Sequence, residues 1–235
     1  MGACPQEPRP RSYNETVVLD RGYIARDGLP PGAWAALDGA FDAMVAGGLP
    51  CGAALTDHSG AVIERGRNHA YDASDGGDVL EGTPLAHAEM NVLARVPIAR
   101  DLSTDTLWST QQPCAMCAAA ISFCGVGQVR FLAVDPAFVA SGDARGGTPS
   151  DPIIERPEWT VWAIFANALF LQPAVARGDA ARLDRNHAVE PETVEAATTL
   201  SVAPRVDGLA ALVNSMWDIL VRLSDKRRER LDGQA

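Results

Sequence analysis

The chain has 235 residues, of which 47% are hydrophobic and 21% are charged, a composition typical of a globular protein with a substantial core. Its net charge of −10 argues against nucleic acid as the main ligand, because phosphate binding normally requires a basic face. The chain lacks the run of about 18 apolar residues that a transmembrane helix needs. Its polar first residues lack the apolar core of a signal peptide, which favours a cytoplasmic protein.

The predicted elements begin after a polar segment. Residues 1–28 are rich in Pro, Arg and Gly, and we expect them to form a loose arm. Residues 33–45 carry apolar side chains at helical spacing and should form a helix. Two short apolar segments at 52–56 and 61–65, separated by turn residues, predict a β-hairpin. A loop rich in Gly and Asp is expected from Tyr71 to Thr83.

Helices and strands alternate in the next part of the chain. Helices are expected over residues 86–96 and 114–123, and each is followed by an apolar strand, at 106–109 and 128–134. Strands separated by helices indicate a partly parallel sheet with helices on its faces. The sequence therefore predicts an α/β protein.

The composition changes after Asp135. Residues 141–152 are rich in Gly, Ser, Asp and Pro and resemble a linker. Helical segments are expected within 159–175, at 191–200 and at 209–231, the last of them amphipathic. The predicted division of the chain is an N-terminal arm (1–28), a zinc-binding domain (29–165) and a helical C-terminal extension (166–235) that packs on the domain or on a partner subunit.

A His and two Cys residues form the candidate metal centre. Five cysteines argue against a disulfide framework here, and Cys114 and Cys117 are spaced to bind one metal ion from a helix start. His87 begins another predicted helix and supplies a third ligand. Three protein ligands and an open position are typical of catalytic zinc, whereas a fourth protein ligand would make the site structural. Cys51 stays open as a fourth ligand, while Cys124 lies about 10 Å further along the helix.

Glu89 follows His87 by two residues and completes the candidate catalytic group. From the first turn of a helix, its carboxylate can face a water molecule at the zinc without binding the metal. Zinc lowers the pKa of such a water towards about 7, and Glu89 can take the proton as general base and return it as general acid. For Glu89 alone, the alternative is an acid that interacts with the helix dipole.

The pattern His87-x-Glu89 followed by Pro113-Cys114-x-x-Cys117 resembles the signature of the zinc deaminases. Three further segments extend this similarity: Gly52–Leu55, Gly66–Asn68 and Thr110–Ile121. They resemble one branch of the cytidine and deoxycytidylate deaminase superfamily, which contains the guanine deaminases and the tRNA adenosine deaminases. The resemblance covers about residues 33–136 and implies a three-layer cytidine-deaminase-like fold, with a mixed sheet of about five strands and helices on both faces.

The resemblance also implies a cofactor and a reaction. One Zn²⁺ per chain is held by His87, Cys114 and Cys117, and Glu89 moves the protons while water replaces an amino group on a heterocyclic ring. Gln112 departs from the family, which commonly has Glu at this position, and this leaves the specific substrate open.

Four further residues are candidates for substrate binding. Asn68 aligns with an asparagine that contacts the base in such enzymes, although a turn residue is the alternative. The backbone N–H of Ala88, at a helix start, can bind an exocyclic oxygen. Trp108 and Ser109 end a strand just before the zinc helix and are candidates for the pocket wall, with the core as the alternative for Trp108.

We therefore expect a zinc-dependent hydrolytic deaminase of a free nucleobase, nucleoside or related amino-heterocycle, with a guanine-like purine favoured. One alternative is a tRNA adenosine-to-inosine deaminase that binds RNA through the basic cluster at Lys226–Arg230. The other is a catalytically inactive, zinc-containing accessory subunit. The expected partners are a small heterocyclic amine and a second copy of the chain in a homodimer; nucleic acid and membrane binding are not expected.

Overall fold

The computed structural model describes residues 28–73, 78–134, 153–155, 160–202 and 208–233. The predicted N-terminal arm, apart from Gly28, and the predicted linker at 141–152 lie outside the described residues.

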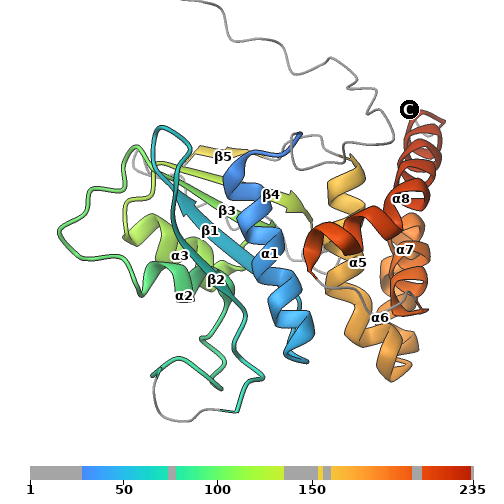
Figure 1. Cartoon of the computed structure of the whole chain (residues 1–235), viewed down its shortest axis with the longest axis horizontal. Helices are drawn as coiled ribbons and strands as arrows, with labels where there is room; N and C mark the ends of the chain where they lie inside the picture. Colours follow the sequence, from blue (N-terminus) through green and yellow to red (C-terminus); the bar gives the residue numbers. More distant parts are fainter. Residues whose placement is uncertain (1–27, 74–77, 135–152, 156–159, 203–207, 234–235) are drawn as a thin grey trace, which may run out of the picture.

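A five-stranded mixed sheet forms the centre of the structure, in the order β2-β1-β3-β4-β5 (Figure 1). Strand β1 pairs antiparallel with β2 and β3, whereas β4 pairs parallel with β3 and β5. The predicted hairpin and the parallel pair around the zinc helix are therefore confirmed. Strand β5, whose position was not predicted, completes the sheet of about five strands that the resemblance implies. The strands are β1 Gly52–Thr56, β2 Val62–Arg67, β3 Thr106–Gln111, β4 Gln128–Ala133 and β5 Ile153–Glu155.

The helices follow the predicted order with two differences. The helix expected over 86–96 is shorter, because Pro97 disfavours helical backbone at Val96 and the chain leaves the helix through tight turns. The polar helix α6 was not predicted. The helices are α1 Pro31–Val45, α2 Ala88–Leu93, α3 Ala115–Phe123, α5 Thr160–Arg177, α6 Ala180–Val189, α7 Pro191–Val202 and α8 Leu209–Asp232.

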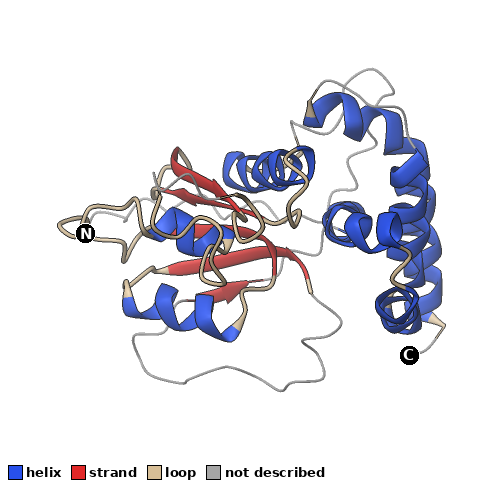
Figure 2. Ribbon diagram, turned by 90° about the horizontal axis from the view of Figure 1, so that it is seen from below, coloured by secondary structure: helices blue, strands red, loops and turns tan. Residues whose placement is uncertain are grey.

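The sheet separates two hydrophobic cores, as expected for successive residues that point to opposite faces of a strand. Leu107 of β3 packs with Val92 of α2 and Ile121 of α3 on one face. Trp108, the next residue, packs with α1 and α5 on the other face. The prediction of a three-layer α/β fold with helices on both faces is confirmed, and Figure 2 shows helices on either side of the strands.

Helix α1 packs very closely on β1. A Cβ atom added to Gly52 would lie 2.0 Å from the carbonyl oxygen of Ala36 and 2.5 Å from the backbone nitrogen of Ala40. Only glycine fits at this position, so this approach of helix and strand depends on it.

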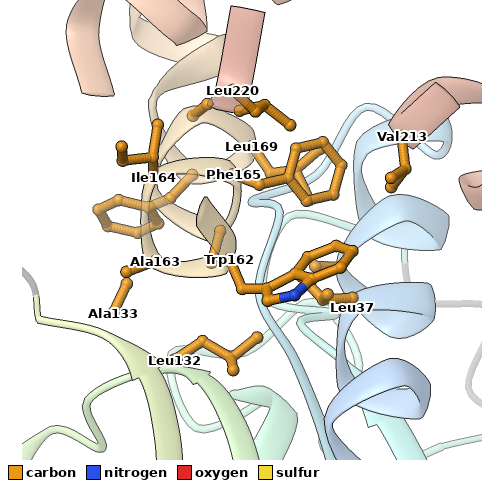
Figure 3. Packing of buried hydrophobic residues seen from close by; sticks show 14 of the residues in the cluster. Leu37, Leu132, Ala133, Trp162, Ala163, Ile164, Phe165, Leu169, Val213 and Leu220 are labelled. Carbon is orange, nitrogen blue, oxygen red and sulfur yellow. The ribbon is translucent and has the colours of Figure 1, made fainter. Parts of the chain in front are cut away.

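Helix α5 joins the sheet to the C-terminal helices. Phe165 is fully buried and belongs to the same core as Leu37 of α1, Leu132 of β4 and Leu220 of α8 (Figure 3). Residue 165, where we divided domain from extension, lies inside this helix. The described helices of the extension therefore pack on the domain of their own chain, while the division itself stays a prediction.

Acidic residues of α7 and the residue before it pair with basic residues of α8. The Arg227 guanidinium binds the Glu190 carboxylate through two hydrogen bonds of 2.6 Å. Arg230 donates to both carboxylate oxygens of Glu192, at 3.0 and 2.9 Å. Glu192 is fully buried, so these pairs lie within the structure rather than on its surface.

Among the described residues, no helix combines the length and apolar character needed to cross a membrane.

Candidate metal centre

The centre is built where two helices begin. His87 is the N-cap residue of α2 and Cys114 is the N-cap residue of α3, both in extended backbone conformation. Neither side chain caps its own helix. A capping side chain at such a position is worth about 1 kcal/mol, so the sequence forgoes that stabilisation at both helix starts. The two side chains are instead directed to a common point.

Cys117 completes this group from the first turn of α3. The Cys114 and Cys117 Sγ atoms are 3.6 Å apart, and Nδ1 of His87 lies 3.5 and 3.6 Å from them. Tetrahedral zinc with ordinary bond lengths places two sulfurs about 3.8 Å apart and nitrogen and sulfur about 3.6 Å apart. The donor atoms and their spacing therefore fit one Zn²⁺. In the part of the chain that the structure describes, this group of potential ligands has three members, all of them predicted.

The two thiols of this group have opposite protonation tendencies. Hydrogen bonds with Cys117 and His87 lower the pKa of Cys114 to about 4. The hydrogen bond with Cys114 and burial raise the pKa of the Cys117 thiol. The hydrogen bond with Cys114 raises the pKa of His87 against the opposing effect of burial. Zinc binds cysteine as the thiolate, so metal binding must displace the proton of the buried Cys117 thiol.

Glu89 lies beside the three ligands in the first turn of α2. It is 6% exposed, and its Oε1 accepts a hydrogen bond of 3.0 Å from the Ser109 hydroxyl of β3. Its Oε2 accepts from the Cys117 thiol at 3.5 Å. Burial raises the pKa of Glu89, although its own backbone N–H and Ser109 oppose the shift. The structure thus holds a buried carboxylate next to the metal ligands and outside their set.

Two of the predicted substrate contacts, Asn68 and Ala88, are buried. Asn68 follows β2 and is 3% exposed, and its Oδ1 accepts from the Ala70 N–H at 3.0 Å. The turn role of Asn68 is thus observed, while base contact stays a prediction. Ala88 is buried as the first residue of α2, between His87 and Glu89.

Trp108 does not join this group. Its indole Nε1 donates to the Thr56 hydroxyl at 3.2 Å, and its ring lies against Gly32 of α1 on the opposite face of the sheet. The Arg130 guanidinium covers the ring at 5.2 Å from its centroid. Since neighbouring strand residues face opposite ways, Ser109 reaches Glu89 and Trp108 cannot. Trp108 thus lies in the core, which is the alternative that the sequence left open, and its role in the pocket stays a prediction.

The loop after Asn68 is anchored by its own charged groups. Arg67 donates two hydrogen bonds to the Asp72 carboxylate, at 3.1 and 2.5 Å. The His69 Nδ1 atom lies 3.5 Å from Asp72 and 3.7 Å from Glu81. The Gly82 N–H also donates to the His69 carbonyl at 3.0 Å, so the described ends of the predicted Tyr71–Thr83 loop are tied together.

Sequence reasoning missed one buried polar residue near the centre. Asn91 of α2 is 2% exposed, and its Nδ2 donates to the carbonyls of Arg67 at 2.8 Å and Ala86 at 3.2 Å. The available signal was an amide side chain between apolar residues of a helix, which by itself does not identify its partners.

Comparisons with known proteins agree with this centre. A family model described as the cytidine and deoxycytidylate deaminase zinc-binding region matches residues 35–133. No curated protein sequence matches the chain.

Several solved structures are similar to parts of the chain. One comes from work on A-to-I editing by tRNA:A34 deaminases at the wobble position; it is 30% identical and covers 53% of this chain and 95% of its own, with a TM-score of 0.44. A guanine deaminase from Nitrosomonas europaea is 21% identical, with 64% and 85% covered and a TM-score of 0.47. A guanine deaminase from Bacillus subtilis is 25% identical, with 51% and 71% covered and a TM-score of 0.39.

The matched residues 35–133 contain both helix starts that bring the ligands together, and with them Glu89 and Asn68. The donor set fits Zn²⁺, and the spacing of its ligands is that of the matching family. Through this region, the chain belongs to the family of zinc-dependent cytidine and deoxycytidylate deaminases.

Proposed function

We propose that the chain is a hydrolytic deaminase of a free nucleobase, nucleoside or related amino-heterocycle, with a guanine-like purine as the favoured substrate. Its family supports the broader class, hydrolases that act on C–N bonds. The observation that carries the proposal is the buried Glu89 carboxylate beside a three-member ligand group. A closed structural zinc site has four protein ligands and needs no such acid.

The residues divide the chemistry between them. His87, Cys114 and Cys117 would hold the zinc ion, which would supply a water molecule with a pKa lowered towards about 7. Glu89 would take up the proton of the attacking water at Oε2, the oxygen that faces Cys117. It then donates that proton to the ring nitrogen next to the reacting carbon and moves a further proton to the amino group. Water and the amino-heterocycle thereby become an oxo-heterocycle and ammonia.

The surroundings of Glu89 suit both halves of this proton transfer. Burial raises the pKa of its carboxyl group, which allows the acid to hold a proton between the two steps. Ser109 binds Oε1 and fixes the orientation of the carboxylate, so that Oε2 is directed at the ligand group. Ser109 is therefore proposed to orient Glu89 as well as to line the pocket.

Asn68 and Ala88 are the proposed substrate contacts. Because the Ala70 N–H occupies Oδ1 of Asn68, the Nδ2 group is the part suited to donate to a substrate. The Ala88 N–H belongs to the first turn of α2, where backbone donors lack partners within the helix. Two donors favour a base that presents acceptors such as a ring nitrogen and an exocyclic oxygen, which suits guanine and cytosine better than adenine.

Ion pairs within the chain argue against RNA binding by the basic cluster of α8, on which the tRNA alternative depends. Three basic side chains of the proposed RNA-binding cluster already pair with acids: Lys226 with Glu195, Arg227 with Glu190 and Arg230 with Glu192. Binding to phosphate would have to break these pairs in a protein whose net charge is −10. The homodimer and the cytoplasmic location stay predictions.

An ammonia-release screen tests the proposal. Zinc-loaded protein is assayed with purines, pyrimidines, their nucleosides, triazines and tRNA, and guanine is expected to react fastest. Glu89→Gln should lower kcat by at least about 100-fold, because it removes the proton acceptor and keeps the size of the side chain. Glu229→Gln, on the exposed side of α8, is the matched control and should leave kcat unchanged.

The outcomes separate the alternatives. Ammonia from tRNA alone would favour the editing function. Absence of ammonia from every substrate would favour the accessory subunit. Full activity of Glu89→Gln would overturn the mechanism.

A further inference from the structure

Asn91 is a buried amide in a short helix that otherwise faces the core. Its neighbours Val92 and Leu93 pack in the hydrophobic core between the sheet and helices α2 and α3. Burying an amide is unfavourable unless its polar atoms are hydrogen-bonded. Its Nδ2 group makes two hydrogen bonds, whereas its Oδ1 is buried without a partner among the described residues. The two N–H groups of Nδ2 therefore make the hydrogen bonds by which this side chain joins other parts of the fold.

The two acceptors lie next to the residues of the proposed site. The Arg67 carbonyl immediately precedes Asn68, and the Ala86 carbonyl immediately precedes His87. The Ala86 carbonyl also accepts from the His69 N–H at 2.9 Å. Both neighbours of Asn68 are thus joined to the segment that leads into His87, one of them through Asn91.

The two hydrogen bonds of Asn91 form a bridge between β2 and the start of α2. This bridge helps to fix the position of α2, because the helix has only six residues. So short a helix has little stability of its own and takes its position from its contacts. The strand β2 and the start of α2 lie far apart in the chain, and Asn91 joins them across 24 residues. Without the bridge, the His69–Ala86 backbone hydrogen bond and the packing of Gly66 against α2 would hold these segments with two fewer contacts beside Asn68 and His87.

We propose that Asn91 is a positioning residue that sets the spacing between the substrate contact Asn68 and the metal ligand His87. The inference rests on the proposed function for the role of Asn68, whereas its effect on His87 concerns metal binding alone. Because the bridge acts on the proposed substrate contact Asn68, its loss should weaken substrate binding more than it slows the chemical step.

The test compares Asn91→Leu with Val92→Ala in the full-length protein. Asn91→Leu removes both donors and fills a similar volume with an apolar group, so it should fold. Asn91→Asp, which places a carboxylate against the two carbonyls, is the more severe second variant. Val92 is fully buried, so Val92→Ala lowers stability by creating a cavity without touching the bridge.

Three measurements are made: kcat and KM with the best substrate from the screen, the absorption spectrum of the Co²⁺-substituted protein, and the rate of zinc loss to a chelator. For Asn91→Leu we expect KM to rise at least about tenfold, with a smaller change in kcat, because substrate placement is affected most. The Co²⁺ spectrum should shift and zinc should be lost faster, since His87 is less well held. Val92→Ala should lower the melting temperature and leave KM, the spectrum and zinc loss unchanged.

The inference is overturned if Asn91→Leu keeps the wild-type KM, Co²⁺ spectrum and zinc loss, or if Val92→Ala reproduces its changes. Failure of the proposed function is recognised separately, because the wild-type protein would then release no ammonia from any heterocycle. In that case the Co²⁺ spectrum and the rate of zinc loss test the bridge to His87 without a substrate. A change in both that is confined to the Asn91 variants supports the bridge, and no change in either refutes it.

Discussion

The Ser109 hydroxyl donates a 3.0 Å hydrogen bond to the Glu89 carboxylate and so joins the central strand β3 to the first turn of α2. Both side chains are buried, at 2% and 6% exposure, so water does not compete for this bond. The orientation of the proposed proton carrier is therefore determined by the sheet as well as by its own helix.

Removal of the Ser109 hydroxyl should lower kcat as well as stability. Ser109→Ala loses a bond to a charged group, which is worth about 1.5–3 kcal/mol, and kcat should fall about tenfold or more with zinc content unchanged. Thr110→Val is the matched control, since it removes the neighbouring buried hydroxyl, which binds the Gly52 N–H. Steady-state kinetics and urea unfolding on both variants check this; an equal loss of kcat in the control would refute the orienting role.

Zinc content should depend on Cys114 and not on Cys124. Cys114→Ser replaces a thiolate ligand by a hydroxyl that does not ionise at neutral pH, so bound zinc should fall from about one equivalent per chain to nearly none. Cys124→Ser changes an exposed cysteine that ends the same helix and should retain the metal. Elemental analysis after desalting gives the stoichiometry, and full zinc content in Cys114→Ser would contradict the assignment of the ligand.

The ion pair between Glu192 and Arg230 should make stability depend on acid pH. Burial pushes the pKa of Glu192 upwards, but the Arg230 guanidinium outweighs it, and the pKa lies below its ordinary value. The pair therefore stabilises the fold above the unfolded-state pKa of about 4.3, and the stabilisation is lost as pH falls through the folded-state pKa. Glu192→Gln should lower the free energy of unfolding at pH 7 by about 2 kcal/mol, with a smaller difference near pH 3.

Glu195→Gln is the control for this prediction. The Glu195 side chain is 37% exposed and pairs with the exposed Lys226, so its loss should cost less than about 1 kcal/mol. Urea unfolding at both pH values measures both variants. A Glu192→Gln effect that persists at pH 3 would show that lost packing, rather than lost charge, is responsible.

Phe165 should stabilise the zinc-binding domain and the C-terminal extension as one cooperative unit. It is fully buried in the core that α1, β4, α5 and α8 share, and Phe165→Ala should lower the free energy of unfolding by about 3–5 kcal/mol. Phe123 is 92% exposed, so Phe123→Ala should have little effect. Unfolding should stay a single transition by circular dichroism; two separated transitions would show that the extension folds independently.

The metal centre could be predicted from the sequence because its geometry is local. His87 and Glu89 share one turn, Cys114 and Cys117 share another, and the chemistry of the donors limits the metal. The sheet was predictable for a similar reason, since apolar strands between helices imply parallel pairing.

Trp108 is a residue for which the sequence analysis left two places open, the pocket wall and the core. The period of two along β3 places Trp108 opposite Ser109, so both could not face one pocket, and alternation alone would have separated them. Asn91 and α6 are different cases. The partners of Asn91 are backbone carbonyls that no side-chain pattern identifies. Helix α6 has only two large apolar residues, Leu183 and Val189, and its start is signalled by Asp179, which accepts from the Arg182 N–H.

Three tryptophans from different helices meet where the extension packs on the domain. The ring of Trp162 on α5 lies 6.3 Å from that of Trp34 on α1 and 5.7 Å from that of Trp217 on α8. Indole emission responds to solvent and to neighbouring rings, so the chain carries its own optical probe of this junction. A red shift of its fluorescence would report separation of the C-terminal helices in real time, without an attached dye and with the metal centre left undisturbed.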